Sequence, residues 1–183
     1  MSDPWHGLNG AQKKKMNVIR GEVEDMCDKY GGERLLAILL TFANPYPDRE
    51  EAERRYRSLY TNLLRKDFEC GATVFERAQK GRPHYHLANV GMADDYSSGF
   101  DWTAYKRNCE LRTLKYQGRL EKALEKEYRA TTRTYGESAN DNLREMWKKY
   151  DRKVMKRYGF GMTTIVPVHS PKGTAVYYAK YLG

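Results

Sequence analysis

The chain has 183 residues and a mass of 21.4 kDa, enough for one domain with a hydrophobic core but not for two domains of ordinary size. Hydrophobic residues make up 40% and charged residues 31%, which is typical of a globular protein, and no uninterrupted apolar run approaches the ~18 residues that a membrane span needs. The formal net charge is +9 and the pI about 9.4. A field of this sign attracts polyanions, of which nucleic acid is the commonest partner of a basic domain.

Cysteine usage and the start of the chain indicate the compartment. Cys27, Cys70 and Cys109 are odd in number and far apart, and the first residues contain no apolar stretch typical of a secretory signal. Such cysteines favour small buried thiols in a reducing environment. We therefore expect an intracellular, cytoplasmic protein that does not associate with membranes.

The first part of the chain predicts a helix, a strand and a second helix. From Ala11 to Tyr30 apolar residues recur at intervals of three and four, as in an amphipathic helix, and Gly31-Gly32 ends it. Residues 34–42 are a continuous apolar run, which favours a strand buried on both faces. A capping box at residues 48–51 predicts a helix that continues to about residue 65.

The middle of the chain predicts a hairpin followed by helices. Residues 68–78 and 83–90 are typical of two strands, and the short glycine-containing connection between them favours a hairpin. Residues 102–158 are highly charged and predict two helical segments separated near Tyr135–Ser138.

The order of these elements predicts the α+β class. Residues 161–168 are expected to form a last strand, and a final helix is expected from Thr174. Together the elements make a mainly antiparallel β-sheet flanked by helices. We expect a single domain over residues 1–183, with residues 102–158 as a helical insertion.

The second arm of the hairpin carries the first candidate site. Alternate side chains of a strand share a face, so His84 and His86 point the same way and could bind one divalent cation. Glu76, on the first arm, joins them as a third ligand if the connection has an odd number of residues, whereas a two-residue turn would place it on the other face. The alternative is a pair of half-exposed strand histidines, because the spacing matches no closed structural zinc site.

The expected final helix carries the second candidate site. Tyr177 and Tyr181 are four residues apart on one helix face, and Lys180 lies on an adjoining face. A phenol with a pKa near 10 is a weak nucleophile, but it can attack phosphorus beside a cation that polarises a phosphodiester and a lysine that neutralises charge. The alternative is an amphipathic helix whose tyrosine rings only pack.

These motifs together resemble the HUH endonucleases, specifically the two-tyrosine rolling-circle replication initiators of single-stranded DNA phages and their relatives. Residues 38–42 match the first family motif, an apolar strand that ends in threonine. Residues 81–87 match the motif with two histidines around a hydrophobic residue, and residues 177–181 match Tyr-x-x-Lys-Tyr, after a strand at residues 165–168. The motifs occur in the order found in the family.

The resemblance implies a fold, an activity and a set of site residues. The fold is a ferredoxin-like or RRM-like sheet, and the activity is cleavage of one DNA strand at an origin, with a 5′-phosphotyrosyl link and a free 3′-hydroxyl. The expected partners are the single-stranded DNA origin and a host helicase and polymerase, in the cytoplasm of a bacterial host. The expected roles are metal ligation of Mn²⁺ or Mg²⁺ by His84, His86 and Glu76, catalysis by Tyr177, Tyr181 and Lys180, and DNA binding by Lys80, Arg82 and Lys172.

The charged segment at residues 102–158 has no counterpart in the resemblance. It contains 16 Lys and Arg against eight Asp and Glu, so +8 of the total +9 lies there. We expect it to hold the DNA that flanks the cut, with Lys148, Lys149, Arg152 and Lys153 among the contacts. The alternative is a solvated pair of helices with ordinary surface charges.

The end of the chain departs from the family pattern, and two other functions remain open. The family pattern often has a second lysine three residues after the second tyrosine, whereas this chain stops at Gly183, so we expect the natural protein to continue. A single-strand transposase shares the same motifs, and a non-catalytic nucleic-acid-binding module would share the charge. A metal hydrolase built on a β/α barrel is excluded, because that fold needs about 250 residues.

Overall fold

The apolar run near residue 40 forms a central strand of the fold. In a computed structural model, which describes residues 9–44, 48–76, 83–170 and 173–174, four strands form an antiparallel sheet of order β2-β3-β1-β4. The strands are β1 (Leu35–Phe42), β2 (Phe68–Glu76), β3 (His84–Gly91) and β4 (Phe160–Pro167). The expected α+β class and antiparallel sheet are confirmed, and each strand lies within two residues of its predicted bounds.

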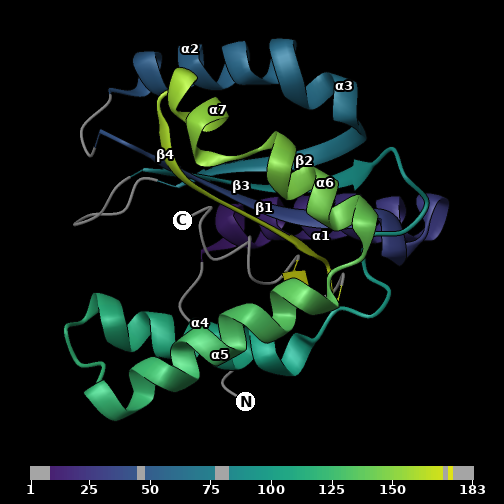
Figure 1. Cartoon of the computed structure of the whole chain (residues 1–183). Helices are drawn as coiled ribbons and strands as arrows, with labels where there is room; N and C mark the ends of the chain where they lie inside the picture. Colours follow the sequence, from purple (N-terminus) through teal and green to yellow (C-terminus); the bar gives the residue numbers. More distant parts are fainter. Residues whose placement is uncertain (1–8, 45–47, 77–82, 171–172, 175–183) are drawn as a thin grey trace.

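Helices cover both faces of this sheet (Figure 1). α1 (Gly10–Tyr30) packs on one face, where Val23 and Met26 belong to an apolar cluster with side chains of β1, β2 and β3 and with Val168. On the opposite face lie α2 (Arg49–Leu59), a π-helical turn (Tyr60–Leu64), the short α3 (Arg65–Asp67), α6 (Asp141–Lys149) and α7 (Arg152–Arg157). A 3₁₀ turn (Gly32–Arg34) joins α1 to β1.

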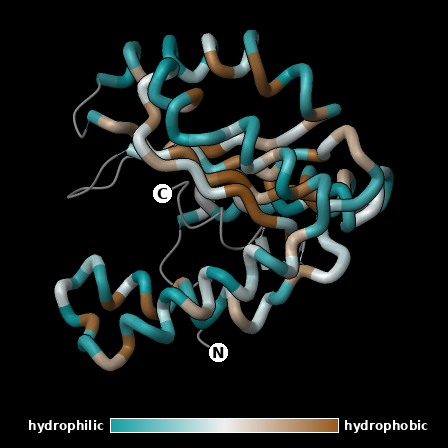
Figure 2. Tube along the Cα trace, viewed as in Figure 1, coloured by the Kyte–Doolittle hydropathy of each residue, from teal (hydrophilic) through white to brown (hydrophobic). Residues whose placement is uncertain are grey.

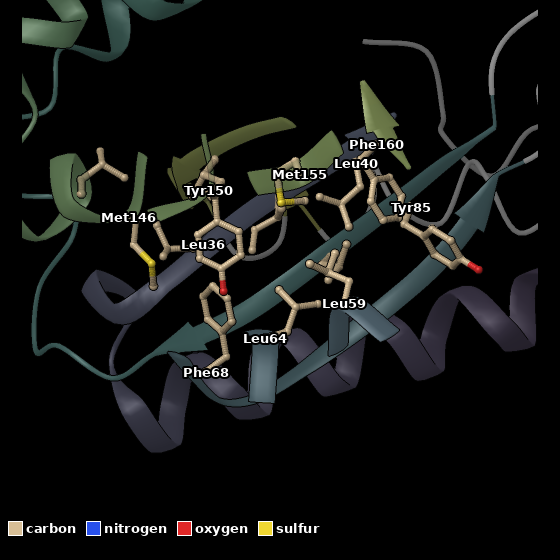
Figure 3. Close-up of a cluster of buried hydrophobic side chains, with 14 of the residues drawn as sticks. Leu36, Leu40, Leu59, Leu64, Phe68, Tyr85, Met146, Tyr150, Met155 and Phe160 are labelled. Atoms are coloured by element: carbon tan, nitrogen blue, oxygen red, sulfur yellow. The ribbon is translucent and has the colours of Figure 1, made fainter. Parts of the chain in front are cut away.

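The larger hydrophobic core lies on the face that α2, α6 and α7 cover. Figure 3 shows Leu36, Leu40 and Phe160 of the sheet packed against side chains from the covering helices. Figure 2 shows the same division along the trace, with hydrophobic positions gathered in the strands and hydrophilic positions on the outer helices. α6 and α7 therefore belong to the main core, to which they contribute Leu143, Met146, Tyr150 and Met155.

The helical segment at residues 102–158 is divided differently from the prediction. It forms four helices, since α4 (Trp102–Tyr116) and α5 (Lys122–Ser138) precede α6 and α7. The break predicted near Tyr135–Ser138 lies slightly too early, because α5 continues through Gly136 to Ser138 and the helix is interrupted at residues 139–140, before α6. A single interior glycine costs a helix only about 1 kcal/mol, which packing overcomes. A further break, which was not predicted, separates α4 from α5 and contains Gly118, whose φ of 66° is the left-handed conformation that glycine tolerates.

Helix capping explains where four of the helices begin. Asp48, Asp101, Asn140 and Asp151 precede α2, α4, α6 and α7, and each side chain accepts a hydrogen bond from a backbone N–H in the first turn. The Asp48 contact, to the N–H of Glu51 at 2.7 Å, confirms the predicted cap. Residues 173–174 are helical, where the final helix is expected to begin, and the N–H of Thr174 donates to the carbonyl of Ser170 at 2.8 Å, whereas the later residues of the expected helix lie outside the described part of the chain.

A buried carboxylate fastens α6 to the start of β2. Asp67 is 8% exposed, and its Oδ2 accepts a hydrogen bond from the Tyr150 hydroxyl at 2.8 Å, while the Lys149 ammonium contacts Oδ1. Burial, followed by the charge of Asp67, raises the pKa of Tyr150 well above its ordinary value, so the phenol stays a donor. The predicted DNA contact Lys149 is therefore engaged in holding the fold.

No helix in the described ranges is both long enough and apolar enough to cross a membrane.

Tyr150→Phe removes only the hydroxyl that donates to Asp67. We expect the free energy of unfolding to fall by about 1.5–3 kcal/mol, the usual contribution of a hydrogen bond to a charged group. Urea denaturation measures the change. Tyr158→Phe is the matched control, because Tyr158 packs against the same core and its hydroxyl makes no hydrogen bond to the residues described. We expect that variant to stay within about 0.5 kcal/mol of wild type, and equal losses in both variants would contradict the role of Asp67.

Candidate metal centre

Strand pairing places Glu76 directly opposite His84. In the antiparallel register of β2 and β3, Glu76 pairs with His84 and Val74 pairs with His86, so the connection at residues 77–83 has an odd number of residues. Directly paired residues share a face of the sheet, and so do alternate residues of one strand. The question that the sequence left open is therefore resolved, and Glu76, His84 and His86 all lie on the face that α1 partly covers.

Two hydrogen bonds hold the histidine rings. His86 Nε2 lies 2.9 Å from Glu76 Oε2, and His84 Nδ1 lies 2.9 Å from the hydroxyl oxygen of Thr41. Thr41 is the cross-strand partner of His84 in β1 and is only 5% exposed. The two rings lie edge to face, with centroids 6.2 Å apart.

Thr41 is a site residue that the sequence analysis did not assign. Its position at the end of an apolar strand was noted only as part of a motif, because the contact with His84 depends on the register between β1 and β3. By engaging Nδ1, Thr41 orients the ring so that Nε2 is the nitrogen through which His84 would bind a metal.

Burial keeps both histidines neutral. Desolvation lowers the pKa of His84 and of His86 below the ordinary value of 6.5, and the negative charge of Glu76 opposes part of each shift. The neutral imidazole is the form that ligates metals. A lowered pKa therefore keeps both rings competent as ligands at neutral pH.

The donor types fit a divalent cation, although the side chains do not already surround one. Two imidazoles and a carboxylate suit Mn²⁺ and are compatible with Mg²⁺. Among the residues described, however, no group of three or more His, Cys, Asp and Glu side chains has the arrangement of a metal site. Glu76 instead contacts His86 directly, so a cation held by both groups would take the place of the hydrogen between them.

The other predicted site residues fall outside the described part of the chain. This applies to the catalytic residues Tyr177, Lys180 and Tyr181 and to the DNA-binding residues Lys80, Arg82 and Lys172. The structure therefore brings together Glu76, His84 and His86 and does not test the other six.

A cavity of about 460 Å³ adjoins His86. One wall is formed by β1 and β4, including Leu39 and Thr164, which pair with each other across the sheet. The other wall is α4, and the end of the cavity is lined by residues near the start of the expected final helix. Sequence analysis could not find this cavity, because its walls are far apart in the chain.

The basic charge of residues 102–158 is divided between two surfaces. The α4–α5 hairpin, residues 102–138, and the following residues 139–158 each carry a net charge of +4. The hairpin lies on the side of the sheet that the histidines face, whereas α6 and α7 lie on the other side (Figure 1).

One curated relative is similar to this chain. The chain is 32% identical over 171 residues to the Phasyl DNA replicon protein arp of Escherichia coli, and the alignment covers 93% of this chain and 50% of that protein. The chain thus spans about half the length of the relative that it matches. No protein-family model matches the chain, and no solved structure gives a significant match.

Glu76→Gln tests the electrostatic coupling within this site in the metal-free protein. Since the carboxylate raises the pKa of both histidines, we expect its neutralisation to lower both values further, with the larger change at His86, its hydrogen-bond partner. An NMR titration of the ring resonances measures this. Glu69→Gln, at the far end of the same strand, should leave both values unchanged. A histidine pKa that rises in Glu76→Gln would contradict the described contacts.

Proposed function

We propose that this chain is a metal-dependent endonuclease of the HUH type that nicks single-stranded DNA to initiate rolling-circle replication. The observation that carries the proposal is the position of Glu76, His84 and His86 on one face of two paired strands, beside a cavity. The similarity to a DNA replicon protein supports a role in replication. A single-strand transposase would use the same residues, and replication is preferred because of that relative.

Each group has a distinct task in the proposed reaction. Glu76, His84 and His86 hold the cation, and Thr41 positions His84. A bound Mn²⁺ or Mg²⁺ would supply Lewis-acid polarisation of the scissile phosphodiester. Tyr177 or Tyr181 forms a bond from its phenolic oxygen to phosphorus, while the bond from phosphorus to the 3′-oxygen breaks. The phenolic proton leaves to solvent, and the departing 3′-oxygen takes up a proton to become the hydroxyl that primes a polymerase.

Two tyrosines allow two successive transfers. Positions four apart on a helix have Cβ atoms about 5–6 Å apart, so both phenols could reach one phosphate in turn. One tyrosine would hold the first 5′ end while the other cuts the regenerated origin. The freed 3′-hydroxyl would then attack the first phosphotyrosine and close the circle. Lys180 would neutralise charge on the scissile phosphate.

A covalent adduct with DNA tests the proposed reaction. Incubation with single-stranded oligonucleotides and Mn²⁺ should give an adduct that survives a denaturing gel. His84→Ala and His86→Ala should each reduce its formation by at least about 100-fold, because loss of a ligand leaves the cation poorly held. Asn62→Ala is the control, since that exposed side chain lies on the π-helical turn at the opposite face of the sheet, and it should retain adduct formation. Wild-type levels in a His84→Ala/His86→Ala double variant would sink the metal assignment.

Single and double Phe replacements distinguish the roles of the two tyrosines. We expect Tyr177→Phe and Tyr181→Phe each to retain some cleavage, the double variant to retain none, and Tyr178→Phe to cleave normally. Tyr178 is about 100° from Tyr177 around a helix and should face elsewhere. Mass spectrometry should find DNA on both Tyr177 and Tyr181 of the wild type. An adduct on one tyrosine alone, with its Phe variant inactive, would rule out alternation.

The divided basic charge gives a matched test of where the DNA binds. We expect DNA to lie on the histidine side, so changing Lys106, Lys115, Lys122 and Lys126 to Gln should weaken binding and flatten its salt dependence by roughly one unit of slope per lost phosphate contact. The same number of changes on α7, at Arg152, Lys153, Lys156 and Arg157, should have the smaller effect. Fluorescence anisotropy at several salt concentrations measures both. The reverse order would place the DNA on the α6 and α7 side.

A further inference from the structure

The cavity beside His86 contains an arginine without a carboxylate partner. Arg112, on α4, lines the cavity and is partly buried, and its Nη2 lies 3.5 Å from Cys109 Sγ. Among the residues that the structure describes, no carboxylate lies within ion-pair distance of Arg112. A buried cation without an anion is costly, so such a position favours an anionic ligand.

Another arginine of the same helix shows the contrast. Arg107 Nε lies 2.7 Å from Glu127 Oε1, and its Nη1 lies 3.1 Å from Glu110 Oε2. The arginine that joins α4 to α5 is thus neutralised twice, whereas the arginine that faces the cavity is not. Cys109 and Arg112 are three residues apart, so they share the face of α4 that lines the cavity. Of these two side chains, only that of Arg112 is charged.

The rest of the cavity wall suits a nucleobase. Tyr105, His169 and Val166 contribute two aromatic rings and an apolar side chain, and Thr164 contributes a hydroxyl. Unpaired bases stack on aromatic side chains in proteins that bind single strands. The volume of about 460 Å³ lies within the ~300–1,000 Å³ range of small-molecule pockets, which accommodates one nucleotide.

We propose that this cavity binds one unpaired nucleotide of the single strand next to the scissile phosphate, with its phosphate on the Arg112 guanidinium and its base against Tyr105 and His169. The assignment rests on the proposed nickase function, because that function brings a single strand to the histidine face. It gives the α4–α5 hairpin a specific role, which is to close a nucleotide pocket over the exposed part of the sheet.

Cys109 provides a direct probe of occupancy. A bound nucleotide would shield its thiol, so a single-stranded oligonucleotide should slow alkylation of Cys109 by iodoacetamide severalfold, as followed by peptide mass spectrometry. EDTA is present throughout to remove divalent cations, so the experiment measures binding without cleavage. Cys27 and Cys70 are internal controls, because they lie with α1 and the distant end of β2, and their rates should not change. Equal rates at Cys109 with and without oligonucleotide would overturn the proposal.

Arg112→Gln should abolish the protection of Cys109 and weaken oligonucleotide binding on the order of tenfold, the usual loss for a hydrogen bond to a charged group. Arg133→Gln, an exposed arginine of α5, removes the same charge and should preserve the protection. Thr164→Phe fills the cavity from the sheet side and should also prevent protection. Thr164→Phe changes β4 and leaves α4 unaltered, so it tests the pocket independently of any disturbance of α4 by Arg112→Gln. Protection of Cys109 that persists in Thr164→Phe would contradict the proposal.

The outcomes separate this inference from the function on which it rests. Protection of Cys109 that depends on Arg112, without any adduct in Mn²⁺, would retain the nucleotide pocket and reject the nickase. An adduct without protection would reject the pocket and retain the nickase. Equal protection by the mononucleotide dTMP, at the oligonucleotide concentration that protects, would show a free-nucleotide site and overturn the assignment to a strand.

Discussion

The register between β2 and β3 is the constraint on which the candidate site depends. Side chains of an antiparallel pair alternate between faces, so a shift of one residue would move Glu76 away from both histidines. The connection at residues 77–83 and the pairing of Val74 with His86 place the carboxylate next to an imidazole. The remaining features of the site, including the contact between Thr41 and His84, follow from the same sheet.

The sheet holds these polar groups in mainly apolar surroundings. This burial is unfavourable for charged imidazoles and favourable for neutral ones. Burial disfavours the charged form of each histidine, so the fold retains them only with a hydrogen-bond partner for each ring. The same burial keeps the rings neutral, as metal ligation requires. The side chain of Glu76 is more exposed, at 22% against 4% for His86, and so lies toward the open side where a substrate would approach.

Strand periodicity allowed much of this arrangement to be predicted from the sequence. The apolar run, the alternating histidines and the hairpin spacing gave the strands within two residues and the shared face of His84 and His86. The side of Glu76 depended on the parity of the connection, which composition does not determine. The role of Thr41 and the cavity depended on contacts between distant segments. The helix boundary predicted near Gly136 lies too early, because tertiary packing there outweighs the low helix propensity of glycine.

We propose that His84 and His86 ligate one divalent cation. Electron spin echo envelope modulation of the protein loaded with one equivalent of Mn²⁺ tests it directly, since nitrogen bound to the metal modulates the echo. Two coordinated histidine nitrogens are expected in the wild type and one in His84→Ala. A spectrum without histidine nitrogen coupling, at Mn²⁺ occupancy confirmed by metal analysis, would contradict ligation by His84 and His86.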